Sequence, residues 1–65
     1  MKMEMIRLAG DCQNDDCPTV YATDRGTIAV QGVIVTDPGR VRLSPGEALV
    51  EISVDLLREA ARAAG

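Results

Sequence analysis

A β-hairpin is encoded near the middle of the chain, together with the chemistry of its turn. The turn is the tripeptide Asp24-Arg25-Gly26, and apolar runs over residues 19–22 and 27–35 flank it. This tripeptide suits a type I turn followed by a glycine in the left-handed region of backbone space. The hairpin therefore predicts a fold that contains a sheet, but it predicts no chemistry.

The strand after this turn carries an irregularity in its apolar pattern. Ile28 and Val30 alternate on one face, whereas Val33 and Val35 continue the series on odd positions. A β-bulge at Gly32 would reconcile the two halves, because one extra residue shifts the facing pattern. A fully buried strand is the alternative, since most residues of this run are apolar.

Turn residues and alternation predict the remaining strands. We expect an edge strand at residues 1–8 and a polar loop with both cysteines at residues 9–18. Reverse turns are predicted at residues 37–40 and 44–47, where proline is followed by glycine. Apolar residues then alternate over residues 48–52, which indicates a last strand.

A helix is predicted at the C-terminus, over residues 53–64. Ser53 is well placed to cap it, with Asp55 near its positive end and Arg62 towards its negative end. Its apolar residues form one broad stripe of Leu56, Leu57, Ala60, Ala61 and Ala64. The fold prediction is thus one α+β domain over residues 1–65: a small, strongly twisted, mostly antiparallel sheet of four or five strands, shaped as a half-barrel, with one C-terminal helix.

Length and composition restrict the classes of protein. A chain of 65 residues without Phe or Trp has a thin aliphatic core, so a disulfide, a metal or a second copy is expected to add stability. The net charge of −3 and the scattered basic residues argue against direct nucleic-acid binding.

No apolar run approaches the ~20 residues that cross a bilayer, and residues 1–8 lack the apolar core of a signal peptide. A cytoplasmic protein without membrane contact is expected.

Cys12 and Cys17 are the one pair of residues with evident chemistry. Two reduced thiols are the favoured interpretation, because the cytosol is reducing. A disulfide is the second, and closing so short a loop would stabilise the chain by about 2 kcal/mol. A zinc site is the third; it would need a second pair of ligands from a dimer mate or from nearby aspartates. Asp11, Asp15 and Asp16 lack the spacing of a calcium loop and are expected to be solvated.

Catalysis is not expected, and neither is a cofactor. The chain has no histidine, so serine or cysteine nucleophiles lack their usual base. Its glycines are isolated and form no phosphate-binding loop. Instead, Arg25 at the hairpin tip and Arg58 and Arg62 of the helix are predicted to contact a protein partner around an apolar centre.

The order of motifs in residues 17–64 resembles that of the small actinobacterial proteins related to the developmental regulator BldB. The resemblance rests on Cys17 before a strand, the run Gly26-Thr27-Ile28-Ala29-Val30, the turn Thr36-Asp37-Pro38, the segment Leu43-Ser44-Pro45-Gly46-Glu47 and a short C-terminal helix. The second cysteine and the acidic loop depart from that pattern. Members of the family are small and are often encoded beside helix-turn-helix regulators.

The resemblance implies a cytoplasmic oligomer that binds a helix-turn-helix transcriptional regulator and acts through association rather than catalysis. A homodimer is also expected from the small aliphatic core and from the apolar residues on both faces of residues 27–35. The alternative function is that of a zinc-binding or redox-responsive protein that uses Cys12 and Cys17.

Overall fold

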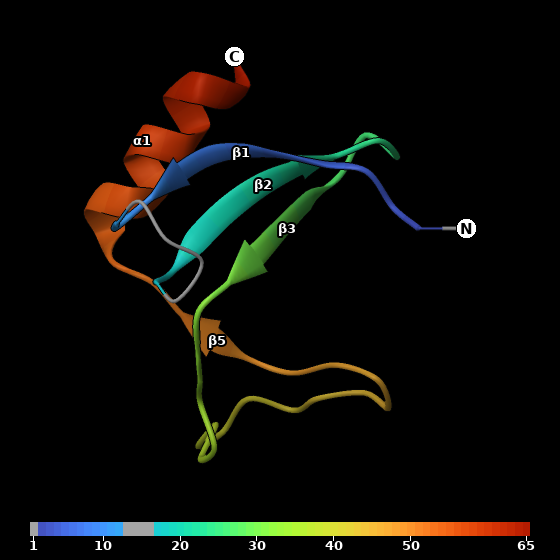
Figure 1. Ribbon diagram of the computed structural model, residues 1–65. Helices are drawn as coiled ribbons and strands as arrows, with labels where there is room; N and C mark the ends of the chain where they lie inside the picture. Colours follow the sequence, from blue (N-terminus) through green and yellow to red (C-terminus); the bar gives the residue numbers. More distant parts are fainter. Residues whose placement is uncertain (1, 13–16) are drawn as a thin grey trace.

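The computed structural model describes residues 2–12 and 17–65 and shows a larger sheet, a smaller sheet and a helix (Figure 1). The larger sheet has strands β1 (Met5–Gly10), β2 (Thr19–Thr23) and β3 (Ile28–Gln31) in that order, all antiparallel. In the smaller sheet, β4 (Val33–Ile34) pairs antiparallel with β5 (Val50–Glu51). Helix α1 (Val54–Ala64) ends the chain. The predicted α+β class is confirmed for these residues, with the strands divided between two sheets.

Strands β2 and β3 form the hairpin that the sequence predicts. Gly26 has a φ of 75°, the left-handed value that its turn requires. The N–H of Thr23 donates to the carbonyl oxygen of Thr27 at 2.9 Å and closes the ladder at the turn. Local turn chemistry therefore fixes the register of the hairpin.

The predicted strand over residues 27–35 is divided at Gly32. A Cβ atom at this position would lie 2.7 Å from the carbonyl oxygen of Glu51. Only a residue without a side chain fits so close to the β5 backbone. At this position the chain leaves the larger sheet and enters the smaller one. The bulge expected at Gly32 is therefore replaced by a break between two strands.

Strand β1 lies later in the chain than the strand predicted at residues 1–8 and takes in the start of the predicted loop. Its register against β2 shifts between Arg7 and Ala9. This shift marks Leu8 as an extra residue, so the bulge of this fold lies in β1. Residues 13–16 of the predicted polar loop lie outside the described residues.

Residues 33–51, here called the arm, extend away from the larger sheet and the helix (Figure 1). Hydrogen bonds close its reverse turns at residues 38–41 and 44–47, and the first lies one residue later than predicted. The strand predicted over residues 48–52 is reduced to the two residues of β5. The arm is therefore held mainly by local turns and a short ladder.

Helix α1 packs against β1 and β2 and supplies half of the core. The Oγ of Ser53 accepts a hydrogen bond from the N–H of Leu56 at 3.0 Å, which is the N-cap that the sequence predicts. Buried aliphatic side chains meet between the helix and the sheet: Ala9, Val20, Leu56 and Ala60, with Leu8 and Ile52 packed against them. Because the helix packs on β1 and β2, the aliphatic side chains Ile28 and Val30 of β3 stay partly exposed to solvent.

Candidate functional site

The larger sheet has an apolar face and a more polar face. Residues opposite each other in an antiparallel ladder share a face, so Val20 and Val30 share one face and Tyr21 and Ala29 the other. The helix packs on the face of Val20, which is buried in the core. On the opposite face, the hydroxyl of Tyr21 donates to Oε1 of Gln31 at 3.1 Å. One face of the sheet thus has a hydrogen bond between polar side chains, and the helix packs on the other, apolar face.

An open groove of about 190 Å³ lies between helix α1 and the apolar face of the sheet. Aliphatic side chains line it on both sides: Leu8, Val20, Ile28 and Val30 from the sheet, and Leu57, Ala60, Ala61 and Ala64 from the helix. None of these side chains can donate or accept a hydrogen bond or change its charge. The groove is therefore suited to holding apolar side chains rather than to performing chemistry.

Three of the large side chains that line this groove remain open to solvent. Ile28 is 51% exposed, Val30 41% and Leu57 57%. Full burial of one such side chain is worth roughly 1.5–3 kcal/mol. A partner that covers the groove would therefore gain binding free energy from contacts that the isolated chain does not make.

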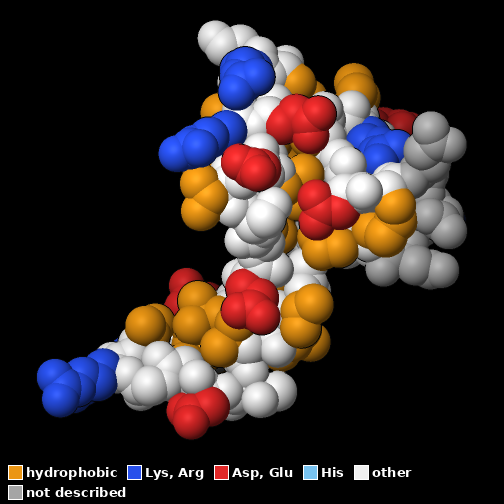
Figure 2. Space-filling model, turned by 90° about the vertical axis from the view of Figure 1, so that its left-hand side faces the viewer, with side chains coloured by type: hydrophobic (Ala, Val, Ile, Leu, Met, Phe, Trp, Pro, Cys, Tyr) orange, Lys and Arg blue, Asp and Glu red, His pale blue; other side chains and the backbone are white. Residues whose placement is uncertain are grey.

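The arm carries a second set of exposed aliphatic side chains. Figure 2 shows hydrophobic side chains gathered on the lower lobe, which corresponds to the arm at the bottom of Figure 1. The large ones are Val33, Ile34, Val41, Leu43 and Val50. Charged residues of the arm lie among them in the sequence, so this surface is less uniformly apolar than the groove.

The arginines predicted to contact a partner occupy two places. Arg58 and Arg62 lie one turn apart on α1, whereas Arg25 lies at the turn between β2 and β3, away from the helix (Figure 1). All three are exposed. Nη1 of Arg58 is 3.9 Å from Oδ1 of Asp55, an exposed ion pair that adds little to stability. The structure therefore brings Arg58 and Arg62 together and leaves Arg25 apart.

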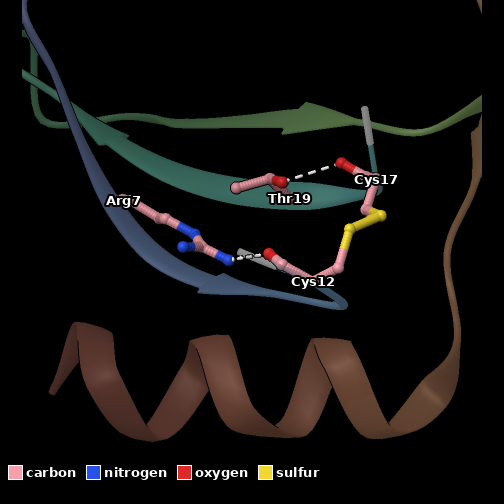
Figure 3. Close-up of a disulfide and its surroundings, with 4 residues drawn as sticks. All are labelled: Arg7, Cys12, Cys17 and Thr19. Carbon is pink, nitrogen blue, oxygen red and sulfur yellow. Dashed lines mark hydrogen bonds between the residues drawn. A yellow bond between two sulfur atoms is a disulfide. The ribbon is translucent and has the colours of Figure 1, made fainter. Parts of the chain in front are cut away.

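Cys12 and Cys17 are joined by a disulfide, with their Cα atoms 5.8 Å apart (Figure 3). The bond lies just beyond the paired ends of β1 and β2. The guanidinium of Arg7 donates to the carbonyl oxygen of Cys12, and the hydroxyl of Thr19 donates to that of Cys17 at 2.8 Å. The structure thus has the disulfide, the second of the three interpretations, and not the two reduced thiols that the sequence favoured.

The disulfide sulfurs are not thiolates, which are the form of cysteine that binds zinc. Across residues 2–12 and 17–65, no group of three or more His, Cys, Asp or Glu side chains is placed to hold a metal ion. Asp15 and Asp16, named above as acidic residues of the loop, lie outside the described part of the chain.

Sequence reasoning missed that Ile28 and Val30 belong to the same site as the helix stripe. Their alternation was visible, and so was the stripe that contains Leu57. What joins them is the docking of α1 on β1 and β2, which leaves the β3 side of the apolar face open. No local pattern in the sequence predicts that the helix packs on β1 and β2 and leaves β3 uncovered.

None of the protein-family models, curated proteins or solved structures compared with the chain matches it. In the described part of the chain, no helix has the length and apolar character needed to cross a membrane.

Proposed function

We propose that this chain is a small, non-catalytic protein–protein interaction module that associates with a helix-turn-helix transcriptional regulator in the cytoplasm. The observation that carries the proposal is the aliphatic groove beside β3, in which Ile28, Val30 and Leu57 are about half exposed. The resemblance of residues 17–64 to BldB-related proteins supports the class of partner.

Charged residues flank the groove in a way that suits a protein interface. Successive residues of an α-helix point about 100° apart, so Arg58 and Arg62 lie beside the groove residues Leu57 and Ala61 on the solvent side of α1. An apolar centre with a polar rim is the usual organisation of an interface. Acidic side chains of the regulator would meet this arginine rim, and its aliphatic side chains would fill the groove.

The proposal is tested by a matched pair of helix variants. Ala61 lines the groove, whereas Ala63 points about 160° away around the helix. Both are exposed alanines near the same helix end, so Ala61→Glu and Ala63→Glu should affect helix stability equally. Against a helix-turn-helix protein encoded beside the gene, we expect Ala61→Glu to weaken binding about tenfold or more, the equivalent of ~1.4 kcal/mol. Ala63→Glu should bind as the wild type does.

Charge reversal at the rim is expected to act in the same direction with a smaller effect. Arg62→Glu should weaken binding while leaving the circular dichroism spectrum unchanged, because exposed charges contribute little to folding. Arg25→Glu tests whether the hairpin tip takes part as well. Full binding by the Ala61→Glu and Arg62→Glu variants would contradict the proposed surface. Strong, salt-dependent DNA binding by the chain alone would contradict the proposed function.

A redox-responsive function is the second candidate, and the disulfide at the ends of β1 and β2 is the observation that favours it. A thiol reductant such as glutathione would break the S–S bond by exchange and become oxidised itself, which would leave Cys12 and Cys17 as two thiols. Loss of their protons would give the thiolates that zinc requires. Thiol titration and a metal assay on freshly purified protein, before and after reduction, test this function. Unchanged regulator binding after reduction, together with absence of bound zinc, would exclude it.

A further inference from the structure

The outer edge of β3 differs from the outer edge of β1. Residues 27–31 contain no charge and no proline, and among the described strands β3 has a neighbour on one side alone. Strand β1, at the opposite edge, carries Arg7 and a bulge at Leu8. Charges, prolines and bulges are the features that keep edge strands from pairing with other chains. Strand β1 has such protection, and β3 lacks it.

The backbone of β3 presents hydrogen-bonding groups at this edge. Thr23 and Thr27 are a hydrogen-bonded pair of the hairpin, since the N–H of Thr23 donates to the carbonyl oxygen of Thr27. Hydrogen-bonded and non-hydrogen-bonded pairs alternate along an antiparallel ladder. With the observed register, the backbone N–H and C=O groups of Ile28 and Val30 point away from β2. These groups are where a further strand would pair.

The solvent-accessible area of the isolated chain is larger than expected for a compact monomer of the same mass. A compact monomer of 6.9 kDa is expected to expose about 4,000 Å², whereas this chain exposes 5448 Å². The excess of about 1,400 Å² is more than the ~800 Å² that each partner buries in a standard interface. The chain therefore has enough spare surface for a stable dimer.

We propose that two copies of this chain pair through β3, antiparallel, with Ala29 on the two-fold axis. In this register the outward groups of Ile28 in one copy bond to those of Val30 in the other, and the reverse, so that the outward backbone groups of both residues are satisfied. Ala29 faces its own counterpart in a non-hydrogen-bonded pair, where the Cα atoms are ~4.5 Å apart. A methyl side chain fits this position without crowding.

A second copy suits this edge because the contact is self-complementary. A two-fold interface brings the same patch together from both sides, and here an uncharged aliphatic strand meets an identical one. Ile28 and Val30 lie on the groove side of β3, so pairing would join the two grooves into one apolar floor between the two helices. The inference rests on the proposed function in this respect: the joined floor is the surface offered to the regulator.

Cysteine cross-linking in the full chain tests this register. At position 29 the expected Cα separation suits a disulfide, which spans roughly 4.4–6.8 Å. Gln31 provides the matched control, because it lies on the same face of the strand while its symmetry mate would be about 13 Å away along the sheet. Under mild copper-phenanthroline oxidation, Ala29→Cys should form a covalent dimer in most chains, and Gln31→Cys should form little. Peptide mapping identifies a link between the introduced thiols and distinguishes it from exchange with the Cys12–Cys17 bond.

A second variant weakens the pairing without a cross-link. Ile28 is 51% exposed, so Ile28→Lys should leave the monomer folded, as checked by circular dichroism. A lysine on an edge strand opposes pairing, and we expect the dimer dissociation constant in sedimentation to rise tenfold or more.

The outcomes separate this inference from the proposed function. A wild-type monomer at high concentration, equal cross-linking of the two cysteine variants, or a dimer that Ala29→Cys does not link would each overturn β3 pairing. Capture of a strand from another protein at this edge, without self-association, would overturn it too. If cross-linking succeeds but Ala61→Glu leaves regulator binding unchanged, the dimer stands and the proposed function fails.

Discussion

The sheet–helix unit, formed by β1, β2, β3 and α1, and the arm of residues 33–51 use similar aliphatic residues to different effect. In the unit, Val20 and Leu56 are 2% and 1% exposed. Every residue of the arm remains at least partly exposed, although valines, leucines and an isoleucine are as frequent there. Aliphatic content therefore does not create a core by itself. A core forms where a helix stripe meets a sheet face, and the arm has no second layer to pack on.

The two regions should also differ in how easily they open. The arm is held by the β4–β5 ladder and by a hydrogen bond of 2.9 Å from the N–H of Val35 to the carbonyl oxygen of Leu49. Segments with few buried apolar contacts open at low free energy. We expect the arm to open locally while the sheet–helix unit stays folded.

The largest effect is expected from a cavity in the unit. Leu56 is fully buried between the helix and the sheet, so Leu56→Ala should lower the free energy of unfolding by about 2–5 kcal/mol. A domain of this size has little more stability than that, and the variant should be largely unfolded. Urea denaturation followed by circular dichroism measures the change. A loss below about 1 kcal/mol, the usual cost of an unremarkable substitution, would contradict the assigned core.

The next effect concerns the disulfide at the end of the unit. The double variant Cys12→Ser/Cys17→Ser should stay folded, because neither cysteine belongs to the buried core. It should lose about 2 kcal/mol, because the bond closes a short loop in the unfolded chain. Urea denaturation of the oxidised, reduced and double-variant proteins gives the difference, and the last two should agree. An unfolded double variant would show that the unit depends on the bond.

A smaller effect is expected where the two regions join. A methyl group in Gly32→Ala would clash with the backbone of Glu51, so β4 and β5 should separate. The cost in unfolding free energy should be about 1 kcal/mol, the net value of one or two hydrogen bonds. In NMR spectra, amide shifts should change in the arm and stay constant in β2. Equal changes in both regions would mean that the arm and the unit fold as one.

The smallest effect is expected within the arm. Ile34 is 64% exposed, so Ile34→Ala should change the unfolding free energy by less than about 0.5 kcal/mol. This variant serves as the control for Leu56→Ala, since both shorten an aliphatic side chain. A loss comparable to that of Leu56→Ala would reveal a core that includes the arm.

Local chemistry determined which parts of the fold could be predicted. The hairpin turn at Gly26 and the N-cap at Ser53 depend on neighbouring residues, and the structure has both. The break at Gly32 and the bulge at Leu8 were not predicted correctly, because they depend on contacts distant in the sequence. At Gly32 the backbone lies so close to the carbonyl group of Glu51 that a Cβ atom would clash with it. The bulge at Leu8 follows from the register of β1 against β2.

The candidate site was predictable in its parts but not in its assembly. Alternation identified Ile28 and Val30, and helical periodicity identified Leu57 and its neighbours. These side chains line one groove because α1 packs on β1 and β2, and this packing depends on tertiary contacts rather than on a local pattern. The favoured interpretation of Cys12 and Cys17 as reduced thiols was wrong for a different reason: spacing alone does not distinguish thiols, a disulfide and a metal site.

The sheet–helix unit is well formed but incomplete along β3, and backbone hydrogen exchange can detect both properties in one experiment. The amide of Ala29 points towards β2, whereas those of Ile28 and Val30 point outwards. At low protein concentration, Ala29 should exchange slowly, and Ile28, Val30 and the arm amide of Val35 should exchange fast. At high concentration, Ile28 and Val30 should become protected while Val35 stays fast. Fast exchange of Ile28 and Val30 at every concentration would contradict pairing through β3. Exchange of Val35 as slow as that of Ala29 would contradict an arm that opens locally.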